Sequence, residues 1–169
     1  MPTPAPAPPS PPPAPVAPPA PDPTAPPPPP PTPPPGGLRS DIAQQLYGLL
    51  NAERQANGVA AVSVHGALVQ AAEAYAQYHF THSDPYQLSH YLDGTPTDRA
   101  ARQGYCCPVG EILVISPGSA ESMVELWMDS PGHRAIIVEP RYVSAGIGCY
   151  STQSGGSGPV LCVGVFGPS

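Results

Sequence analysis

The sequence predicts an α+β domain preceded by a proline-rich N-terminal segment. Of the 30 prolines in the 169 residues, 22 lie within residues 2–35, a stretch with no aromatic residue and one charge, Asp22. Such a segment has too little apolar surface to offset the entropy lost on folding, so residues 1–37 are predicted to be a disordered linker or stalk. Residues 38–169 combine helical and strand patterns, and they are numerous enough to bury the core of one domain.

The first half of this domain shows helical periodicity. Apolar residues three, four and seven apart predict a helix that Ser40 or Asp41 caps and that stops at Asn57-Gly58. A second helix is expected over residues 66–80. Its buried stripe should comprise Leu68, Ala71, Ala72, Tyr75 and His79.

Two shorter helices are expected further along. Thr95 and Asp98 form a capping pair around Pro96, which predicts a helix that starts there. Another helix is expected over residues 120–129. Its apolar face should present Met123, Leu126 and Trp127.

Strand-type runs occupy residues 111–115, 143–150 and 159–166. The last two should form a hairpin around Gly155-Gly156, in which paired residues have numbers that sum to 311. Cys149 and Cys162 satisfy this rule, so we expect them to face each other and form a disulfide.

The remaining cysteines, Cys106 and Cys107, are adjacent and stay unassigned. The absence of any CxxC pair argues against a zinc site built from the four cysteines. A vicinal disulfide, or a bond from one of this pair to Cys149 or Cys162, fits the same count. Four cysteines, a proline-rich arm and no lysine favour an oxidising location, so the protein is expected to be secreted or associated with the cell envelope.

Charge and hydropathy exclude several classes of partner. Six arginines stand against twelve acidic residues, for a net charge of −6, which does not favour nucleic acid or an anionic membrane surface. No apolar run approaches the roughly 18 residues of a membrane span. Met1 leads directly into Pro-Thr-Pro, so no secretory signal is expected within these residues, and a signal peptide removed before them fits the same sequence. The proline-rich arm is expected to act as a spacer, for example through a cell wall, or as a ligand for proline-binding domains.

Two histidines and one glutamate are the candidate site residues. His90 and His133 are each expected on a turn and not on a helix face, so that their rings can point into a cleft, and Glu111 begins a strand run. Two imidazoles and a carboxylate can bind a divalent metal such as zinc, or can serve in general acid–base catalysis. Their spacing alone does not show that they converge.

Several motifs resemble the CAP superfamily (cysteine-rich secretory, antigen 5 and pathogenesis-related proteins), and most closely its short bacterial SCP-like branch. They occur in the family's order over residues 46–165. They include Leu49 to Arg54, Ser89-His90, Asp93 to Pro96, Asp98-Arg99, Gly104-Tyr105, Gly110-Glu111, Trp127 to Arg134 and Gly146 to Gly148. The resemblance implies an α-β-α sandwich with a small antiparallel sheet, and a cleft in which His90, Glu111 and His133 meet.

Two departures weaken a fully equipped site. The family's Gly-Glu-Asn reads Gly110-Glu111-Ile112 here, and its second acidic residue falls on Ser130. The resemblance therefore favours a non-enzymatic module that needs no cofactor and binds a small apolar ligand, lipid or sterol-like, or a protein partner.

Two alternatives remain open. His90 and His133 could hold a metal with Glu111 as base in a hydrolase, or the three residues could only form a structural hydrogen-bond network.

Overall fold

The computed structural model describes residues 36–153 and 158–168. The predicted linker, apart from its last two residues, and the Gly155-Gly156 turn lie outside these ranges. The helices are α1 (Ser40–Ala56), α2 (Gly66–His82), α3 (Pro96–Arg102), α4 (Ala120–Asp129) and α5 (Pro131–Ile137). The strands are β1 (Gly37–Leu38), β2 (Ser63–Val64), β3 (Gly110–Ser116), β4 (Ser144–Ser151) and β5 (Val160–Gly167). Within the described residues, no helix is long and apolar enough to cross a membrane.

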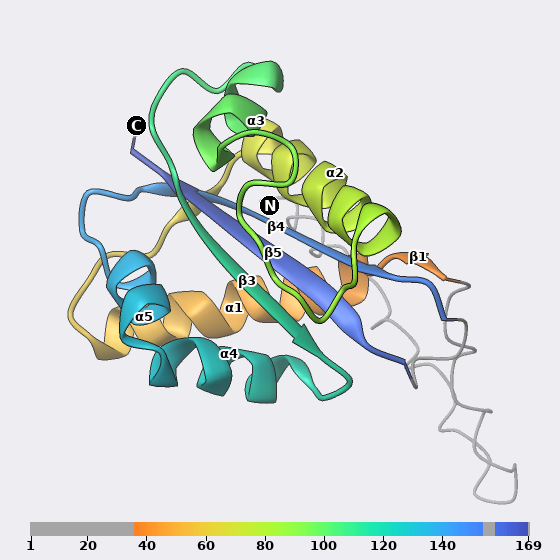
Figure 1. Cartoon of the computed structure of the whole chain (residues 1–169). Coiled ribbons are helices and arrows are strands. Elements are labelled where there is room, and N and C mark those ends of the chain that lie inside the picture. Colours follow the sequence, from red (N-terminus) through yellow and green to blue (C-terminus); the bar gives the residue numbers. More distant parts are fainter. Residues whose placement is uncertain (1–35, 154–157, 169) are drawn as a thin grey trace, which may run out of the picture. The chain divides into compact units, whose positions relative to one another are not determined.

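One five-stranded sheet lies between two layers of helices, which confirms the predicted α+β sandwich (Figure 1). The strand order is β1-β4-β5-β3, and the short β2 also pairs with β4. All pairings are antiparallel except that of β2 with β4, which is parallel. Helices α2 and α3 cover one face of the sheet, and α1, α4 and α5 lie on the other side.

Each face of the sheet has its own apolar core because successive strand residues point to opposite faces. On β3, Ile112 and Val114 pack with Trp127 in the core beneath α1 and α4. Leu113, between them in sequence, packs with Leu68 in the core beneath α2. Glu111 has the same parity as Leu113, so its side chain faces the α2 and α3 layer.

The glycines of β4 allow α2 to pack closely on the sheet. A Cβ atom at Gly146 would lie 2.1 Å from the backbone of Leu68, and one at Gly148 would lie 2.2 Å from the amide nitrogen of Glu73. Real Cβ atoms do not approach backbone so closely, so only glycine fits at either position. The intervening Ile147 points to the opposite core.

The hairpin register predicted from the sequence is confirmed. Strands β4 and β5 pair so that residue numbers sum to 311, which places Cys149 opposite Cys162. The two form a disulfide with Cα atoms 4.1 Å apart, buried in the core beneath α1. Cys106 and Cys107 are free, with Sγ atoms 2.6 Å apart. The crossed pairing with Cys149 or Cys162 is therefore wrong.

Two details of the helix predictions are wrong. The N-cap of α1 is Arg39, without a side-chain capping bond, because Asp41 instead accepts two hydrogen bonds from the Arg39 guanidinium. Leu126 is 53% exposed. Residues Ala120, Met123, Val124 and Trp127 form the buried stripe of α4, and Leu126 lies beside this stripe. The predicted capping box of Thr95 and Asp98 is present at α3.

Candidate functional site

Glu111 lies at the centre of a buried cluster of charged side chains. It is the second residue of β3 and is 5% exposed. Its Oε2 accepts a hydrogen bond of 2.6 Å from Nη2 of Arg99, and its Oε1 lies 2.9 Å from Nδ1 of His90. Because an ionised carboxylate only accepts, His90 donates through Nδ1–H. Both oxygens of Glu111 are thus engaged by side chains.

Arg99, for which the sequence suggested no role, organises the cluster. It belongs to α3 and is 4% exposed. Its Nη1 donates to the carbonyl oxygens of His90 (2.9 Å) and Gly94 (2.7 Å), and its guanidinium lies 3.4 Å from the ring centroid of Tyr75. One arginine therefore neutralises Glu111 and ties the backbone around His90 to α3. The Asp98-Arg99 motif was the available signal, but an arginine in a short helix usually faces solvent.

Helix α2 also holds this loop, residues 83–95. The Tyr75 hydroxyl donates to the carbonyl oxygen of Ser89 (2.5 Å), and Nε2 of His79 accepts from the Ser89 amide (3.1 Å). Nδ1 of His79 lies 3.1 Å from Oγ of Ser83. Burial lowers the pKa of His79, which agrees with a neutral imidazole that accepts at Nε2.

His133 lies in a helix, so its predicted location on a turn is wrong. Ser130 is the N-cap and Pro131 the first residue of α5, a proline position that favours a helix start. Nδ1 of His133 is buried and has no hydrogen-bond partner among the described residues. Burial is the main cause that lowers the pKa of His133. Among the described residues, no hydrogen bond joins His133 to His90 or Glu111.

The two departures from the family pattern lie outside the Glu111 cluster. Ile112 is fully buried in the core beneath α1 and α4, on the opposite face of the sheet from Glu111. A hydrocarbon at this position fills that core and takes no hydrogen bond from the carboxylate. Ser130 caps α5 through its backbone position, without a side-chain capping bond.

The arrangement does not fit the metal centre considered for His90, Glu111 and His133. Within residues 36–153 and 158–168, no group of three or more His, Cys, Asp or Glu side chains is placed to hold a metal ion. Arg99 and His90 occupy both carboxylate oxygens, and the guanidinium already supplies the positive charge that a metal would bring.

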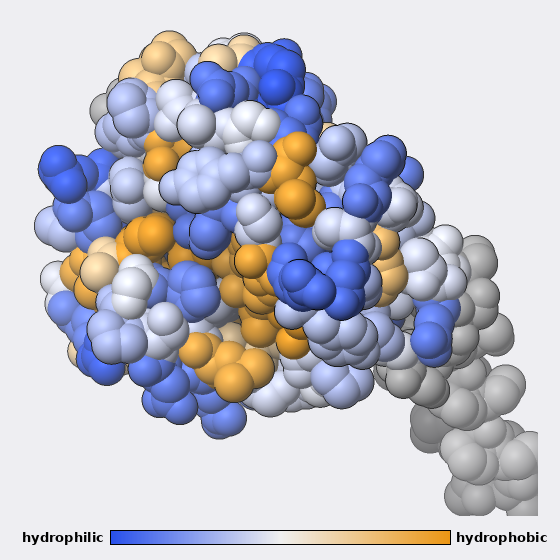
Figure 2. Space-filling model, viewed as in Figure 1, coloured by the Kyte–Doolittle hydropathy of each residue, from blue (hydrophilic) through white to orange (hydrophobic). Residues whose placement is uncertain are grey.

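Large apolar side chains are exposed around His90. This apolar loop consists of Tyr86, Leu88, Tyr91 and Leu92, with exposed fractions of 66%, 41%, 71% and 40%. Figure 2 shows apolar surface among hydrophilic side chains on the face of the molecule that carries this loop. Four exposed apolar side chains therefore lie within seven positions of one loop.

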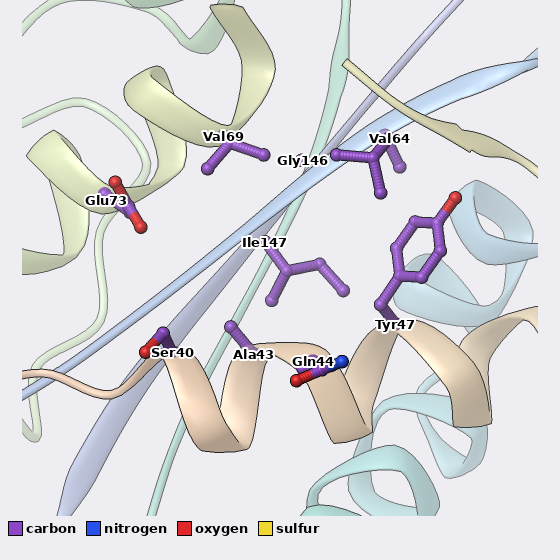
Figure 3. A pocket seen from close by; sticks show the side chains of 10 residues that line it. Ser40, Ala43, Gln44, Tyr47, Val64, Val69, Glu73, Gly146 and Ile147 are labelled. Atoms are coloured by element: carbon purple, nitrogen blue, oxygen red, sulfur yellow. The ribbon is translucent and has the colours of Figure 1, made fainter. Parts of the chain in front are cut away.

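A second apolar feature lies between α1 and α2, where the edge of β4 is open (Figure 3). This groove, called the β4 groove below, has a volume of about 320 Å³. Its walls come from α1, α2 and β2, and β4 forms its floor. It is lined by Ser40, Ala43, Gln44, Tyr47, Val64, Val69, Glu73, Ala145, Gly146 and Ile147.

Comparison with known proteins agrees with this fold. The family model CAP, the cysteine-rich secretory protein family, matches residues 47–166, which is most of the chain. The chain belongs to the CAP family. Both cysteines of the disulfide and all three candidate residues, His90, Glu111 and His133, lie within the matched range.

The similar proteins are bacterial. Uncharacterized protein YkwD of Bacillus subtilis (strain 168) is 30% identical over 112 residues, which are 63% of this CAP chain and 41% of that protein. This chain thus spans less than half of that relative's length.

Solved structures show the same fold. An outer surface protein from Borrelia burgdorferi matches with a TM-score of 0.68 at 20% identity, covering 79% of this chain and 98% of that one. An extracellular protein containing a SCP domain from Bacillus anthracis str. Ames matches with a TM-score of 0.65 at 16% identity, covering 77% and 41%.

Proposed function

We propose that this CAP domain is a non-catalytic binding module that acts outside the cytoplasm and takes a small apolar ligand, lipid or sterol-like, or an apolar protein surface. The observation that carries the proposal is the state of Glu111. Arg99 and His90 engage both of its oxygens, so it serves neither as a free base nor as an open metal ligand.

The apolar loop is the surface that we assign to binding. Tyr75, His79 and Arg99 hold its backbone from two helices, so the exposed Tyr91 and Leu92 are displayed in a prearranged position. Prearrangement reduces the entropy that a loop loses when it binds. In this account the buried Glu111 cluster supports the loop, and His90 lies at its base.

An extracytoplasmic location is part of the proposal. The Cys149–Cys162 disulfide is expected to persist in an oxidising compartment. The names of the two similar structures describe an outer surface protein and an extracellular protein, which supports the same location for this chain.

The test uses the full chain and cis-parinaric acid, a fluorescent fatty acid, as the apolar probe. Replacing Tyr91 and Leu92 together by serine should weaken binding about tenfold or more, because both side chains lose apolar contact with the probe. Leu126→Ser, at an exposed apolar position on α4, is the matched control and should bind as the unmodified chain does. Absence of binding, or equal loss in both variants, would contradict the small-ligand proposal.

A structural role is the second candidate, and the density of the buried network favours it. In that case the Glu111 cluster holds loop 83–95 in place and the loop binds nothing. A metal-dependent hydrolase would require Glu111 to leave Arg99, at the cost of an unpaired buried guanidinium. Stability measurements with and without zinc, described in the Discussion, separate these candidates.

A further inference from the structure

We propose that the β4 groove binds a short extended peptide, whose main chain pairs with the open edge of β4. This site lies apart from the apolar loop and goes beyond the function proposed above. Its evidence is a gap in the hydrogen bonding of the sheet, at the floor of an apolar groove.

The gap follows from the bonds on either side of it. On the outer edge of β4, the amide of Arg39 donates to the carbonyl oxygen of Cys149 (2.8 Å), and the amide of His65 donates to that of Ala145 (2.9 Å). Because backbone groups alternate in direction along a strand, Ile147, midway between, also directs its N–H and C=O outwards. No partner for either group is present in the described part of the chain.

The neighbouring strands cannot close this gap. Strand β1 runs antiparallel to β4 and turns into α1 at Ser40, whereas β2 runs parallel and turns into α2 at Gly66. Both therefore leave the edge just before Ile147. The two helices then diverge above and below it, as Figure 3 shows, and the groove remains between them.

The geometry selects the chemistry of the ligand. To satisfy the N–H and the C=O of Ile147 together, a ligand must supply an acceptor and a donor at strand spacing, as one extended amino-acid residue does. A sterol hydroxyl or a fatty-acid carboxylate does not supply both at that spacing. A volume of about 320 Å³ is at the lower end for small-molecule sites, which suits a peptide of two or three residues.

The walls add side-chain preferences. Tyr47, Val64 and Val69 surround the open edge with apolar surface, which favours a small apolar side chain on the ligand. Glu73 contributes the one charged group of the lining, a carboxylate from α2. We therefore expect the ligand to combine one apolar residue with one positively charged residue.

The experiment follows the Ile147 amide by NMR in the ¹⁵N-labelled full chain, with acetyl-Val-Lys-amide as the probe. In the free chain this amide should exchange with solvent at least tenfold faster than those of Gly146 and Gly148, which pair with β5. The peptide should shift its resonance and slow its exchange. The same peptide with an N-methylated valine cannot donate to the Ile147 carbonyl and should bind at least tenfold more weakly.

Variants test the location. Gln44→Trp places a large ring at the groove from an exposed helix position and should abolish the shift. Gln45→Trp, the next residue of α1, does not line the groove and should leave it unchanged. Glu73→Gln should weaken acetyl-Val-Lys-amide but not acetyl-Val-norleucine-amide.

Three outcomes would overturn the proposal: slow exchange of Ile147 in the free chain, equal affinity for the N-methylated peptide, or a fatty acid that shifts the Ile147 amide in place of the peptide. The Tyr91 and Leu92 serine variant should bind the peptide normally. Failure of the peptide proposal for the β4 groove is thus distinguishable from failure of the proposal that the apolar loop binds a ligand.

Discussion

At the scale of single residues, the pairing of Arg99 with Glu111 decides what the site can do. Both side chains are almost fully buried, at 4% and 5% exposure, and each is the other's counter-charge. Removing one partner of such a pair leaves a buried charge without compensation, which costs more than the pair itself contributes.

Glu111→Gln should therefore destabilise the protein by about 2–4 kcal/mol, since Arg99 stays buried without its carboxylate. The measurement is chemical denaturation with and without added zinc. Glu139→Gln breaks a more exposed ion pair with Arg141, which solvent screens, and should change stability far less than Glu111→Gln does. If added zinc changes the free energy of unfolding of the unmodified protein but not that of the Glu111→Gln variant, the metal-dependent alternative is favoured over a metal-free cluster.

The sequence identified Glu111 and His90 as members of one site, because motifs of the family mark both positions. It did not identify Arg99 as their partner. All six basic residues are arginines, and neither charge nor periodicity distinguishes the buried Arg99 and Arg54 from exposed ones. Arg54 donates to the carbonyl oxygens of Ala60, Ile137, Glu139 and Tyr142, contacts that only the folded chain brings together.

At the scale of elements, the close packing of α2 on β4 positions both candidate surfaces. The missing side chains at Gly146 and Gly148 let the α2 backbone approach the strand. This approach places Tyr75 and His79 beneath loop 83–95, and it also sets one wall of the β4 groove. A small change in the strand should thus displace both surfaces.

Gly146→Ala should destabilise the protein by more than about 3 kcal/mol, because its Cβ would lie 2.1 Å from the α2 backbone, which cannot yield as a side-chain end can. Gly48→Ala is the matched control. Nothing lies within 4 Å of a Cβ there, and alanine favours the α1 helix by up to about 1 kcal/mol. Thermal unfolding of both variants checks the pair, and a Gly146→Ala variant as stable as the parent would refute the packing argument.

Four helices and three strands followed closely from local pattern, whereas α5, β1 and β2 were not predicted. The exceptions have local causes. The start of α1 was misplaced because Asp41 pairs with Arg39 and does not cap the helix. His133 was placed on a turn because Pro131-Gly132 is typical of one, yet proline also suits the first position of a helix.

At the scale of the whole molecule, the buried His79 and the half-buried His133 link stability to pH. Burial is the main cause that lowers the pKa of both His79 and His133 below the ordinary value of 6.5. Each is therefore neutral in the folded protein over a range in which the unfolded chain takes up a proton. Their contribution to stability is complete above pH 6.5 and is lost as the pH falls below it.

The free energy of unfolding should accordingly decrease below pH 6.5, by up to about 1.4 kcal/mol per pH unit for each of these histidines. Urea denaturation between pH 7.5 and 5 measures this slope. His79→Gln keeps an acceptor for the Ser89 amide and should flatten the slope, whereas His82→Gln, at an exposed position at the end of α2, should not. An unchanged slope in His79→Gln would show that His79 is not the linked group.

Sequence alone predicted four of the helices, the runs that form β3, β4 and β5, the β4–β5 register with its disulfide, and the site that His90 and Glu111 share, but not α5, β1 or β2. These features follow from periodicity, turn residues and motifs, which act over short stretches of chain. Tertiary structure alone decided that Arg99 neutralises Glu111, that loop 83–95 displays apolar side chains, and that the edge of β4 stays open at Ile147. Each of these depends on segments that meet only when helices pack on the sheet, and local pattern does not specify which distant groups become neighbours.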